Sequence, residues 1–346
     1  MKSGRNAIAR TPVRALVKPR RRVGRFLLAL VLAACTALPT ACGGDDKLPM
    51  SAVIYAGGTT GVYYQYAEAL RATLAKSVGP LTVVPTSGSV ENLNRLASGG
   101  TASPQPAADT AFALTAADAA DAANTGQAPF DKPIPVRAVA RLYDDYIHLV
   151  VPADSPVQNV SQLRGLRVSI GGAGSGTQLI AQRILTADGV DWEHALQAVP
   201  MGLADSVAAL KDHRIDAFFW SGGLPTSGVD DLARTTPFRL LDLAEEATKL
   251  RYRFGTSYRT GTIPTGTYAD VAKVTTIAVP NLLVTLAGTR DTDVWRFTSA
   301  LFADKPALAP RVLVARQLDP SIAVYTEPIE LHPGAAGYYR SIKPGL

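Results

Sequence analysis

Short β-type runs alternate with apolar residues at helical spacing along most of this chain, and no other feature constrains the fold as strongly. Strand followed by helix, repeated, predicts an α/β fold, here with a largely parallel sheet. The expected strands are Ser51–Tyr55, Leu81–Val84, Ile147–Val151, Arg167–Ile170, Ala217–Phe219 and Thr275–Val279. The expected helices are Tyr64–Ser77, Val90–Ala97, Gln178–Ala187, Ala204–Lys211 and Val294–Phe302. Residues 99–108 and 124–135 are expected to be loops.

The first 42 residues have the pattern of an export and lipid-anchoring signal. Three arginines at 20–22 and Arg25 precede an apolar run, 26–34, that is too short to cross ~30 Å of hydrocarbon as a helix. Cys35 has a leucine three residues before it, which fits the bacterial lipobox, whereas Cys42 is followed by a flexible Gly-Gly-Asp-Asp tether. We prefer Cys35 as the anchor, with Cys42 as the alternative. A plain secretory peptide with incidental cysteines stays open, as does twin-arginine export.

Removal of this leader reverses the sign of the net charge. Residues 1–42 hold nine of the 35 basic residues and none of the 29 acidic ones. The formal charge of +6 therefore becomes −3 in the rest of the chain. Without the leader the chain has no excess of basic residues to bind nucleic-acid phosphates, so we expect no nucleic-acid partner.

Chain length and the scarcity of cysteine and histidine limit the chemistry further. About 300 residues remain after the leader, which exceeds the usual size of a single core and predicts two lobes. No cysteine follows Cys42, which excludes disulfides, thiolate catalysis and thiolate zinc sites beyond that residue. The four histidines are scattered without ligand-like pairing, so we expect no metal and no cofactor.

Two glycine-rich loops, 57–62 and 171–176, stand where a strand passes into a helix. The free N–H groups of a helix start favour anionic or polar groups, and glycine lets a ligand approach the backbone closely. The second loop lacks the lysine of a phosphate-binding loop and the spacing of a dinucleotide-binding one. Ser175 is also not in a nucleophile elbow. Two such loops suit opposite walls of one cleft, although an ordinary turn with a threonine cap remains the alternative for the first.

Two further loops follow expected strands. Residues 86–92, Thr-Ser-Gly-Ser-Val-Glu-Asn, begin a helix with Ser89 as the expected N-cap. Residues 216–223 end a strand with Trp220, Ser221 and two glycines. The carboxyl end of a strand is where open α/β sheets bind ligands, so Trp220 is a candidate cleft residue as well as a candidate core residue.

At these four loops the chain resembles the solute-binding proteins of TRAP transporters, in the TAXI family. The resemblance covers residues 51–346 and depends on six segments in this order: Gly58–Tyr64, Thr86–Leu93, Gly174–Thr177, Ile215–Phe219, Ile263–Tyr268 and Leu331–Tyr339. It implies a two-lobed periplasmic-binding-protein-like α/β fold with a ligand cleft between the lobes, and no enzymatic activity.

The resemblance also implies a domain plan and a set of partners. Residues 1–50 would be the lipoprotein signal peptide and tether, residues 51–149 with 280–346 the first lobe, and residues 150–279 the second. The chain would cross between the lobes near Val150–Pro152 and Val279–Asn281. The receptor would be exported and held by its lipid on the outer face of the cytoplasmic membrane. It would deliver glutamate, glutamine or a related carboxylate to integral membrane TRAP permease subunits.

The expected ligand-binding residues fall into three groups. Donors at helix starts would come from Gly58, Thr59, Thr60, Ser175, Gly176 and Thr177. Aromatic walls would come from Tyr63, Tyr64 and Trp220. Polar side chains of the other two loops would come from Ser87, Ser89, Asn92 and Ser221.

One segment departs from the family pattern. After Phe112 the family usually shows a Gln-Ser-Asp run, whereas this chain has Ala-Leu-Thr-Ala at 113–116, which removes polar groups and leaves the usual ligand in question. Two alternative functions stay open beside that of a TRAP-transporter receptor. One is a receptor for an ABC-type transporter, and the other is an exported serine hydrolase with Ser175 as nucleophile and His148 or His213 as base.

Overall fold

The computed structural model describes residues 50–99 and 108–343. These residues belong to one compact unit. The leader with Cys35 and Cys42 lies outside the described residues, as does most of the predicted loop at 99–108. No helix of the described part has the length and apolar character needed to cross a membrane.

Ten strands form one mixed sheet. The strands are β1 Ala52–Tyr55, β2 Leu81–Val84, β3 Thr110–Ala116, β4 Val136–Pro152, β5 Arg167–Ser169, β6 Gln197–Val199, β7 Ala217–Gly222, β8 Phe238–Leu240, β9 Arg259–Ile263 and β10 Val274–Leu286. Eight of them lie side by side in the order β2-β1-β3-β10-β4-β7-β5-β6. Outside this order, β8 pairs with β4 and β9 pairs with β10.

Helices cover both faces of this sheet. They are α1 Val62–Val78, α2 Ser89–Ala97, α3 Ala117–Thr125, α4 Gly176–Ala187, α5 Leu203–Lys211, α6 Ser227–Ala233, α7 Ala244–Phe254, α8 Asp291–Ala303, α9 Lys305–Leu308, α10 Pro320–Ala323 and α11 Pro333–Ile342. Short 3₁₀ helices span Val160–Leu163 and Leu313–Gln317. The predicted loop at 124–135 begins two residues late, because α3 continues to Thr125.

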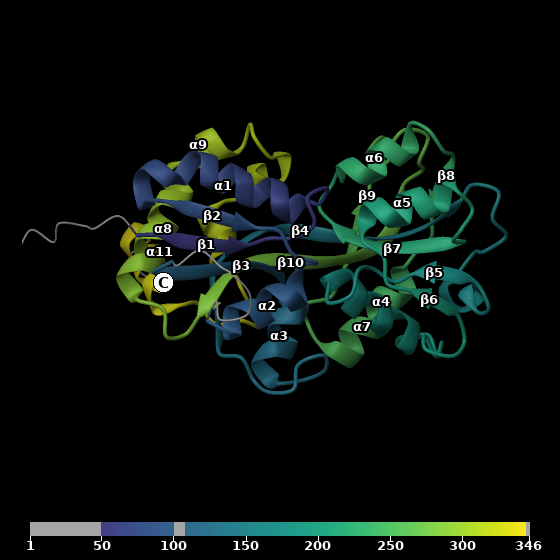
Figure 1. Ribbon diagram of the computed structural model, residues 1–346, viewed down its shortest axis with the longest axis horizontal. Coiled ribbons are helices and arrows are strands. Elements are labelled where there is room, and N and C mark those ends of the chain that lie inside the picture. The colour runs from purple at the N-terminus through teal and green to yellow at the C-terminus, as the bar shows by residue number, and fades with distance from the viewer. Residues whose placement is uncertain (1–49, 100–107, 344–346) are drawn as a thin grey trace, which may run out of the picture. The chain divides into compact units, whose positions relative to one another are not determined.

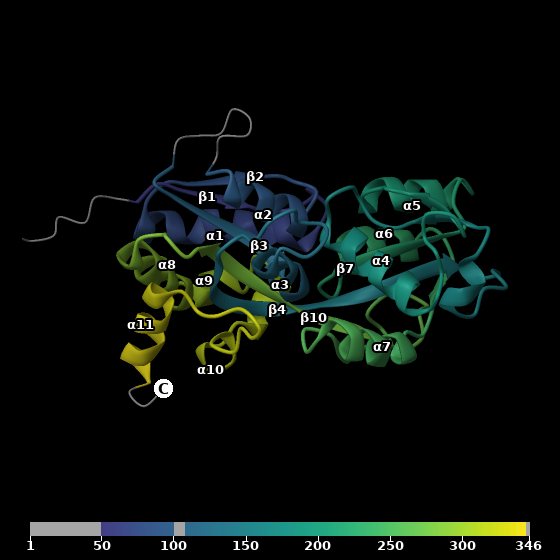
Figure 2. The ribbon, with the colours of Figure 1, turned by 90° about the horizontal axis from the view of Figure 1, so that it is seen from below.

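The expectation of a largely parallel sheet is wrong. Strands β1, β2 and β3 are parallel to one another, and so are β5, β6 and β7. Between these groups lie β4 and β10, two long strands that run antiparallel to each other and to their other neighbours. Figure 2 shows both strands passing from one group of elements to the other. The two parallel groups are thus joined by a shared antiparallel pair.

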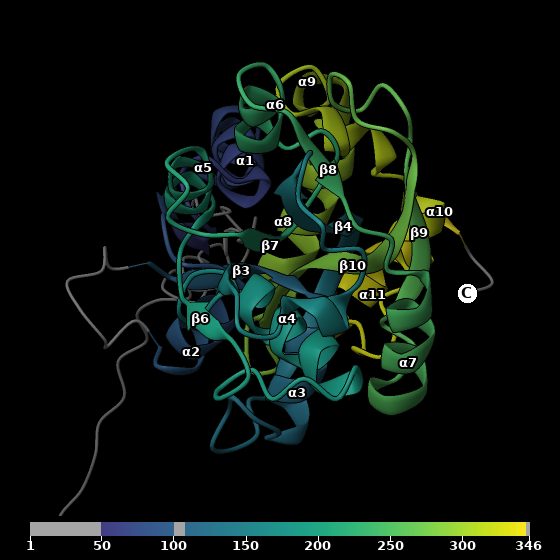
Figure 3. The same ribbon diagram turned by 90° about the vertical axis from the view of Figure 1, so that its right-hand side faces the viewer.

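Each parallel group lies between two helical layers because side chains alternate along its strands. In β1, Ala52 and Ile54 pack toward α1, α8 and α11, whereas Val53 and Tyr55 pack toward α2 and α3. In β7 the alternation directs Phe219 toward α4 and α7, and Phe218 toward α5 and α6. Figures 1 and 3 show these layers on either side of the sheet. Four apolar cores result, two for each group.

Candidate functional site

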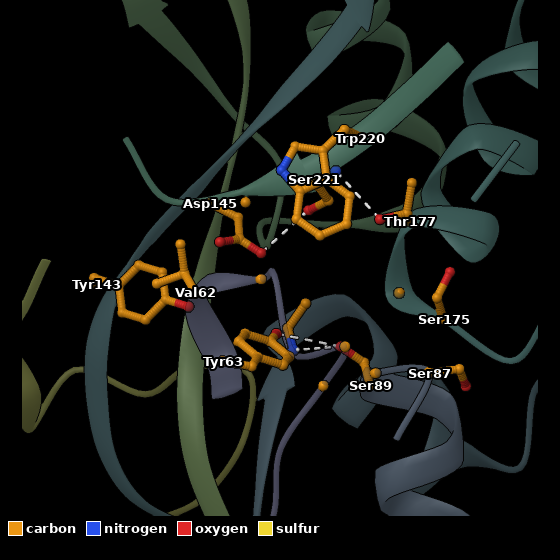
Figure 4. A pocket seen from close by; sticks show the side chains of 17 residues that line it. Val62, Tyr63, Ser87, Ser89, Tyr143, Asp145, Ser175, Thr177, Trp220 and Ser221 are labelled. Carbon is orange, nitrogen blue, oxygen red and sulfur yellow. Dashed lines mark hydrogen bonds between the residues drawn. The ribbon is translucent and has the colours of Figure 1, made fainter. Parts of the chain in front are cut away.

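A cavity lies where loops from both groups of elements meet (Figure 4). The space in it that water can reach is about 50 Å³, and the empty space between its atoms, open mouth included, is about 440 Å³. Its walls are formed by Gly57, Gly58, Gly61, Val62, Tyr63, Ser87, Gly88, Ser89, Ala116, Tyr143, Asp145, Ser175, Gly176, Thr177, Trp220, Ser221 and Gly222.

Three helices begin at this cavity. Helix α1 follows β1 and has Gly61 as its N-cap, and helix α2 follows β2 and has Gly88. Helix α4 follows β5 and has Ser175, whose Oγ accepts a hydrogen bond from the Gln178 N–H at 3.0 Å. Neither glycine can supply a side-chain cap, so the first N–H groups of α1 and those of Ser89 and Val90 in α2 have no side-chain acceptor. The three helix dipoles together favour a negative or carbonyl group in the cavity.

The starts of α2 and α4 touch each other across the cavity rim. The Glu91 N–H donates to the Gly174 carbonyl at 3.0 Å. A Cβ atom on Gly176 would lie 2.7 Å from Ser89 Oγ, which is closer than side chains tolerate. Glycine at 176 is therefore required by this close approach and not by its backbone angle, since Gly176 belongs to α4. The structure thus has the two groups of elements in direct contact around the cavity.

Aromatic rings form two walls of the cavity. Figure 4 shows Trp220 and Tyr63 on opposite sides of it. Trp220 Nε1 donates to Thr226 Oγ1 at 3.1 Å, which fixes the indole. The Tyr63 hydroxyl contacts Ser89 Oγ at 3.2 Å and donates to Asn281 Oδ1 of β10. Both rings therefore have fixed positions, and their faces line a largely apolar slot.

Asp145 of β4 is the only Asp, Glu, Lys, Arg or His among the described residues that line the cavity. It is 3% exposed. Ser221 Oγ donates to its Oδ2 at 3.2 Å, and its Oδ1 has no hydrogen-bond partner among the described residues. Burial raises the pKa of this carboxyl to about 7, although the nearby Asn281 amide and the Ser221 hydroxyl act in the opposite direction. A buried acid is thus part of the cavity wall, with its unpaired Oδ1 covered by protein atoms and the Asn281 amide of β10 beside the carboxyl.

The structure brings most of the predicted site residues to this one cavity. Its walls include Gly58, Tyr63, Ser87, Ser89, Ser175, Gly176, Thr177, Trp220 and Ser221. Thr177 Oγ1 also accepts a hydrogen bond from the Ser221 N–H at 3.2 Å, so these two loops hold each other in place.

Four predicted residues do not line the cavity. Thr59 and Thr60 are exposed, because the Gly61 N–H donates to the Gly58 carbonyl and closes a turn that carries the two threonines outward. Tyr64 packs against the apolar core beneath α1. Asn92 is fully buried, and its Nδ2 donates to the carbonyls of Ala56 and Leu114. Asn92 therefore ties α2 to the ends of two strands.

Tyr143 and Asp145, which also line the cavity, were not predicted as site residues and lie on a part of β4 that was not predicted to be a strand. The available signal was the Asp-Asp pair at 144–145, two acids inside a long apolar β-type segment. Ala116, one of the residues that stand where the resembled family shows a polar run, also lines the cavity. At that position the wall is a methyl group.

The contacts of Ser175 can be compared with those that the nucleophile of a serine hydrolase requires. Its hydroxyl accepts from Gln178 N, and no histidine of the described residues is hydrogen bonded to it. His148 is buried and pairs with Tyr268 Oη and the Tyr146 carbonyl. Burial lowers the pKa of His148 to about 4. Ser175 therefore has the surroundings of a helix cap rather than those of an activated nucleophile.

Potential metal ligands do not gather at the cavity. Among the described residues, one group could bring at least three ligand atoms together, Asp191, Glu193 and His194. All three are exposed and none lines the cavity.

Comparison with known proteins assigns the chain to a family. The sequence profile of the NMT1-like family matches residues 54–342. The chain belongs to this family. The NMT1-like chain is also similar to the solved structure of MatC from Rhodopseudomonas palustris with bound malate, at 16% identity, a TM-score of 0.51, and coverage of 80% of this chain and 90% of MatC. The chain is likewise similar to XAC2383 from Xanthomonas citri bound to chloride ion, at 14% identity, a TM-score of 0.50, and coverage of 86% of this chain and 100% of XAC2383.

These likenesses establish the fold. The NMT1-like chain has the two-lobed α/β fold of periplasmic binding proteins, as predicted from the sequence. In this fold the pair β4 and β10 runs between the two groups of elements, and the cavity lies between their facing loops.

Proposed function

We propose that this protein is an extracytoplasmic receptor that captures a small polar or carboxylate-bearing solute and delivers it to a TRAP-type secondary transporter. The observation that carries the proposal is the convergence of α1, α2 and α4 on one small cavity, with two of the helices left uncapped by side chains. Such a cavity holds a negative or carbonyl group by backbone donors alone. It offers no nucleophile paired with a base, so the proposed role is binding and not catalysis.

The proposed solutes are glutamate, glutamine or a dicarboxylate. Their carboxylates suit the three helix starts at the cavity. MatC, which shares the fold, was solved with malate, a small dicarboxylate. This supports a small organic acid as the solute class.

The proposed partners are the membrane subunits of a TRAP permease, and the proposed location is the outer face of the cytoplasmic membrane, with the lipid on Cys35 or Cys42. Support comes from the family segments and the leader pattern in the sequence. A neighbouring gene for the TRAP membrane subunits would support this assignment. A neighbouring ATPase gene would favour the ABC-type alternative.

The experiment is to identify what the folded protein retains. Mass spectrometry after gentle purification should find a bound small acid, and the same compound should raise the melting temperature. At ~100-fold excess over its Kd a ligand adds about 2.7 kcal/mol to the free energy of unfolding. No retained solute, together with unchanged melting curves for amino acids and dicarboxylates, would contradict a receptor function.

A further inference from the structure

We propose that His148 and Tyr268, two buried residues outside the cavity, are positioning residues of the solute site. Through Thr226 they hold the Trp220 indole and the start of α6 against the start of α1. The inference rests on the proposed receptor function and adds residues that act on the solute through Trp220. It also gives a role to the segment Ile263–Tyr268, which carried part of the family resemblance although none of its residues lines the cavity.

The Trp220 indole is a wall of the cavity that reaches the opposite group of elements. A Cβ atom on Gly61, the N-cap of α1, would lie 3.5 Å from Trp220 Cη2, which is ordinary van der Waals contact. A Cβ atom on Gly222 would lie 2.5 Å from Trp220 Nε1, so a side chain at 222 would displace the indole. A rotation of this ring therefore changes both the shape of the cavity and the contact with α1.

Thr226 connects this ring to the interior of the protein. Its Oγ1 accepts a hydrogen bond from Trp220 Nε1 at 3.1 Å and donates to the Gly223 carbonyl at 2.7 Å. Thr226 is buried and is the N-cap of α6. The next residue, Ser227, contacts the loop before α1, because its Oγ donates to the Thr60 carbonyl at 3.2 Å. The position of Thr226 thus sets both the Trp220 wall and one contact across the cleft.

The backbone of Thr226 is held by Tyr268 and His148. The Thr226 N–H donates to Tyr268 Oη at 3.0 Å. Because this N–H can only donate, the hydroxyl proton of Tyr268 is left for His148 Nε2, 2.9 Å away. His148 therefore carries its own proton on Nδ1, which lies 2.9 Å from the Tyr146 carbonyl. Each donor in this chain has an acceptor, although His148 and Tyr268 are only 0% and 1% exposed.

The ionisation of both side chains suits these hydrogen bonds. Burial lowers the pKa of His148 to about 4, so Nε2 keeps its lone pair near neutral pH. Burial raises the pKa of Tyr268 to about 12, so its hydroxyl keeps its proton. Removal of either group leaves a buried polar atom without a partner. We expect the cost to appear as a loosened Thr226 and a less well held Trp220.

The first test observes the Trp220 indole and needs no solute. In a background that carries Trp192→Phe and Trp295→Phe, Trp220 is the one remaining tryptophan of the chain. Quenching of its fluorescence by acrylamide then reports how well the ring is held. Tyr268→Phe should raise the quenching constant, because the Thr226 N–H loses its acceptor.

Tyr339→Phe is the matched control. It also removes the hydroxyl of a buried tyrosine, which donates to the Val139 carbonyl at 3.2 Å and lies outside the cavity walls. It should leave the quenching constant unchanged. Two variants of His148 cover the case in which Tyr268→Phe does not fold. His148→Leu should raise the quenching constant, and His148→Gln, whose amide oxygen can accept from Tyr268, should return it toward that of the parent.

The second test measures affinity, with glutamate as the probe and the other two tryptophans in place. Calorimetric titration should show glutamate bound about 5-fold more weakly by Tyr268→Phe than by the parent, which is the effect of about one hydrogen bond. Tyr339→Phe should bind glutamate like the parent, although urea unfolding should show a similar loss of stability in both variants. A purely structural hydroxyl would not separate affinity from stability in this way.

Several results would overturn the inference. Parent-like quenching in Tyr268→Phe and His148→Leu would show that the chain does not hold Trp220, and so would equal changes in Tyr268→Phe and Tyr339→Phe. Raised quenching with unchanged glutamate affinity would show that the ring position does not matter for binding. If glutamate does not bind the parent protein, that result counts against the proposed solute, and the quenching comparison alone decides whether Tyr268 and His148 position Trp220.

Discussion

At the scale of single residues, Asp145 should make the stability of the solute-free protein depend on pH. Burial raises its pKa in the folded protein to about 7, well above the usual value of 3.8. Between about pH 4 and pH 7 the folded protein therefore keeps a proton that the unfolded chain has released. The contribution of Asp145 to the free energy of unfolding is present at low pH and is lost as the pH rises to about 7.

Asp145→Asn removes this dependence. Relative to the parent, the variant should gain stability as the pH rises from 5 to 8, by up to about 3 kcal/mol, because about two pH units at 1.36 kcal/mol each lie between pH 5 and the folded-state pKa. Urea unfolding at both pH values measures the gain. Asp144→Asn serves as the control, since Asp144 is ion-paired with Arg141 and Arg259. If the Asp145→Asn and parent curves run parallel with pH, Asp145 is not a buried acid of raised pKa.

Residues of the cleft could be predicted where their role follows from a local pattern. Glycines and serines between a strand and a helix, such as Gly58 and Gly176, indicate a helix start, and the structure places both at the cavity. Asp145 could not be predicted in this way, because its exposure to the cavity depends on how β4 pairs with β7 and β10. Thr60 belongs to the same motif as Gly58, but a single turn carries its side chain to the surface, which the local pattern did not predict.

At the scale of elements, helices α3 and α4 are joined by a buried ionic cluster. Arg183 of α4 lies 3.5 Å from Asp118 of α3, and both contact the Tyr258 hydroxyl at 2.7 Å. The side chains of Arg183 and Asp118 are 11% and 3% exposed. The Arg183 guanidinium also lies over the Phe254 ring, 4.9 Å from its centre. The cluster thus fixes α4, whose start forms one end of the cavity.

Arg183→Met should destabilise the protein by about 3 kcal/mol or more, because Asp118 would remain buried without its cation. Combining it with Asp118→Asn should restore part of the loss, since the orphaned charge is then removed. Arg167→Met is the matched control: its pair with Asp216 is partly exposed and should contribute about 1 kcal/mol or less. Equal losses for Arg183→Met and Arg167→Met, measured by urea unfolding, would show that burial of the cluster is unimportant.

Elements were predictable where their periodicity is strong. The helices around Tyr64–Ser77 and Gln178–Ala187 appear as α1 and α4, each slightly longer than predicted. Strand direction was not predictable, because residues alternate in the same way in parallel and antiparallel strands. The long segments Val136–Pro152 and Val274–Leu286 therefore gave no sign that they pair antiparallel and join the two groups of strands.

At the scale of the whole molecule, the leader pattern predicts how the protein is held at the membrane. If Cys35 carries the lipid, Cys35→Ala should release the protein from membranes, whereas Cys42→Ala should leave it attached. Fractionation of cells that express each variant measures this directly. If only Cys42→Ala releases the protein, the lipid is on Cys42. If neither variant releases it, the lipoprotein proposal is contradicted.

The central claim is that the solute is bound between the starts of α2 and α4, and Gly176→Val tests it most directly. A side chain at 176 would meet Ser89 at 2.7 Å and force the two helix starts apart. Calorimetric titration with the solute retained on purification should show binding weaker by about 10-fold or more, with the folded state intact by thermal unfolding. Gly288→Val, at an exposed position with open space around it, should bind like the parent. Parent-like affinity in Gly176→Val would contradict the claim and place the solute elsewhere.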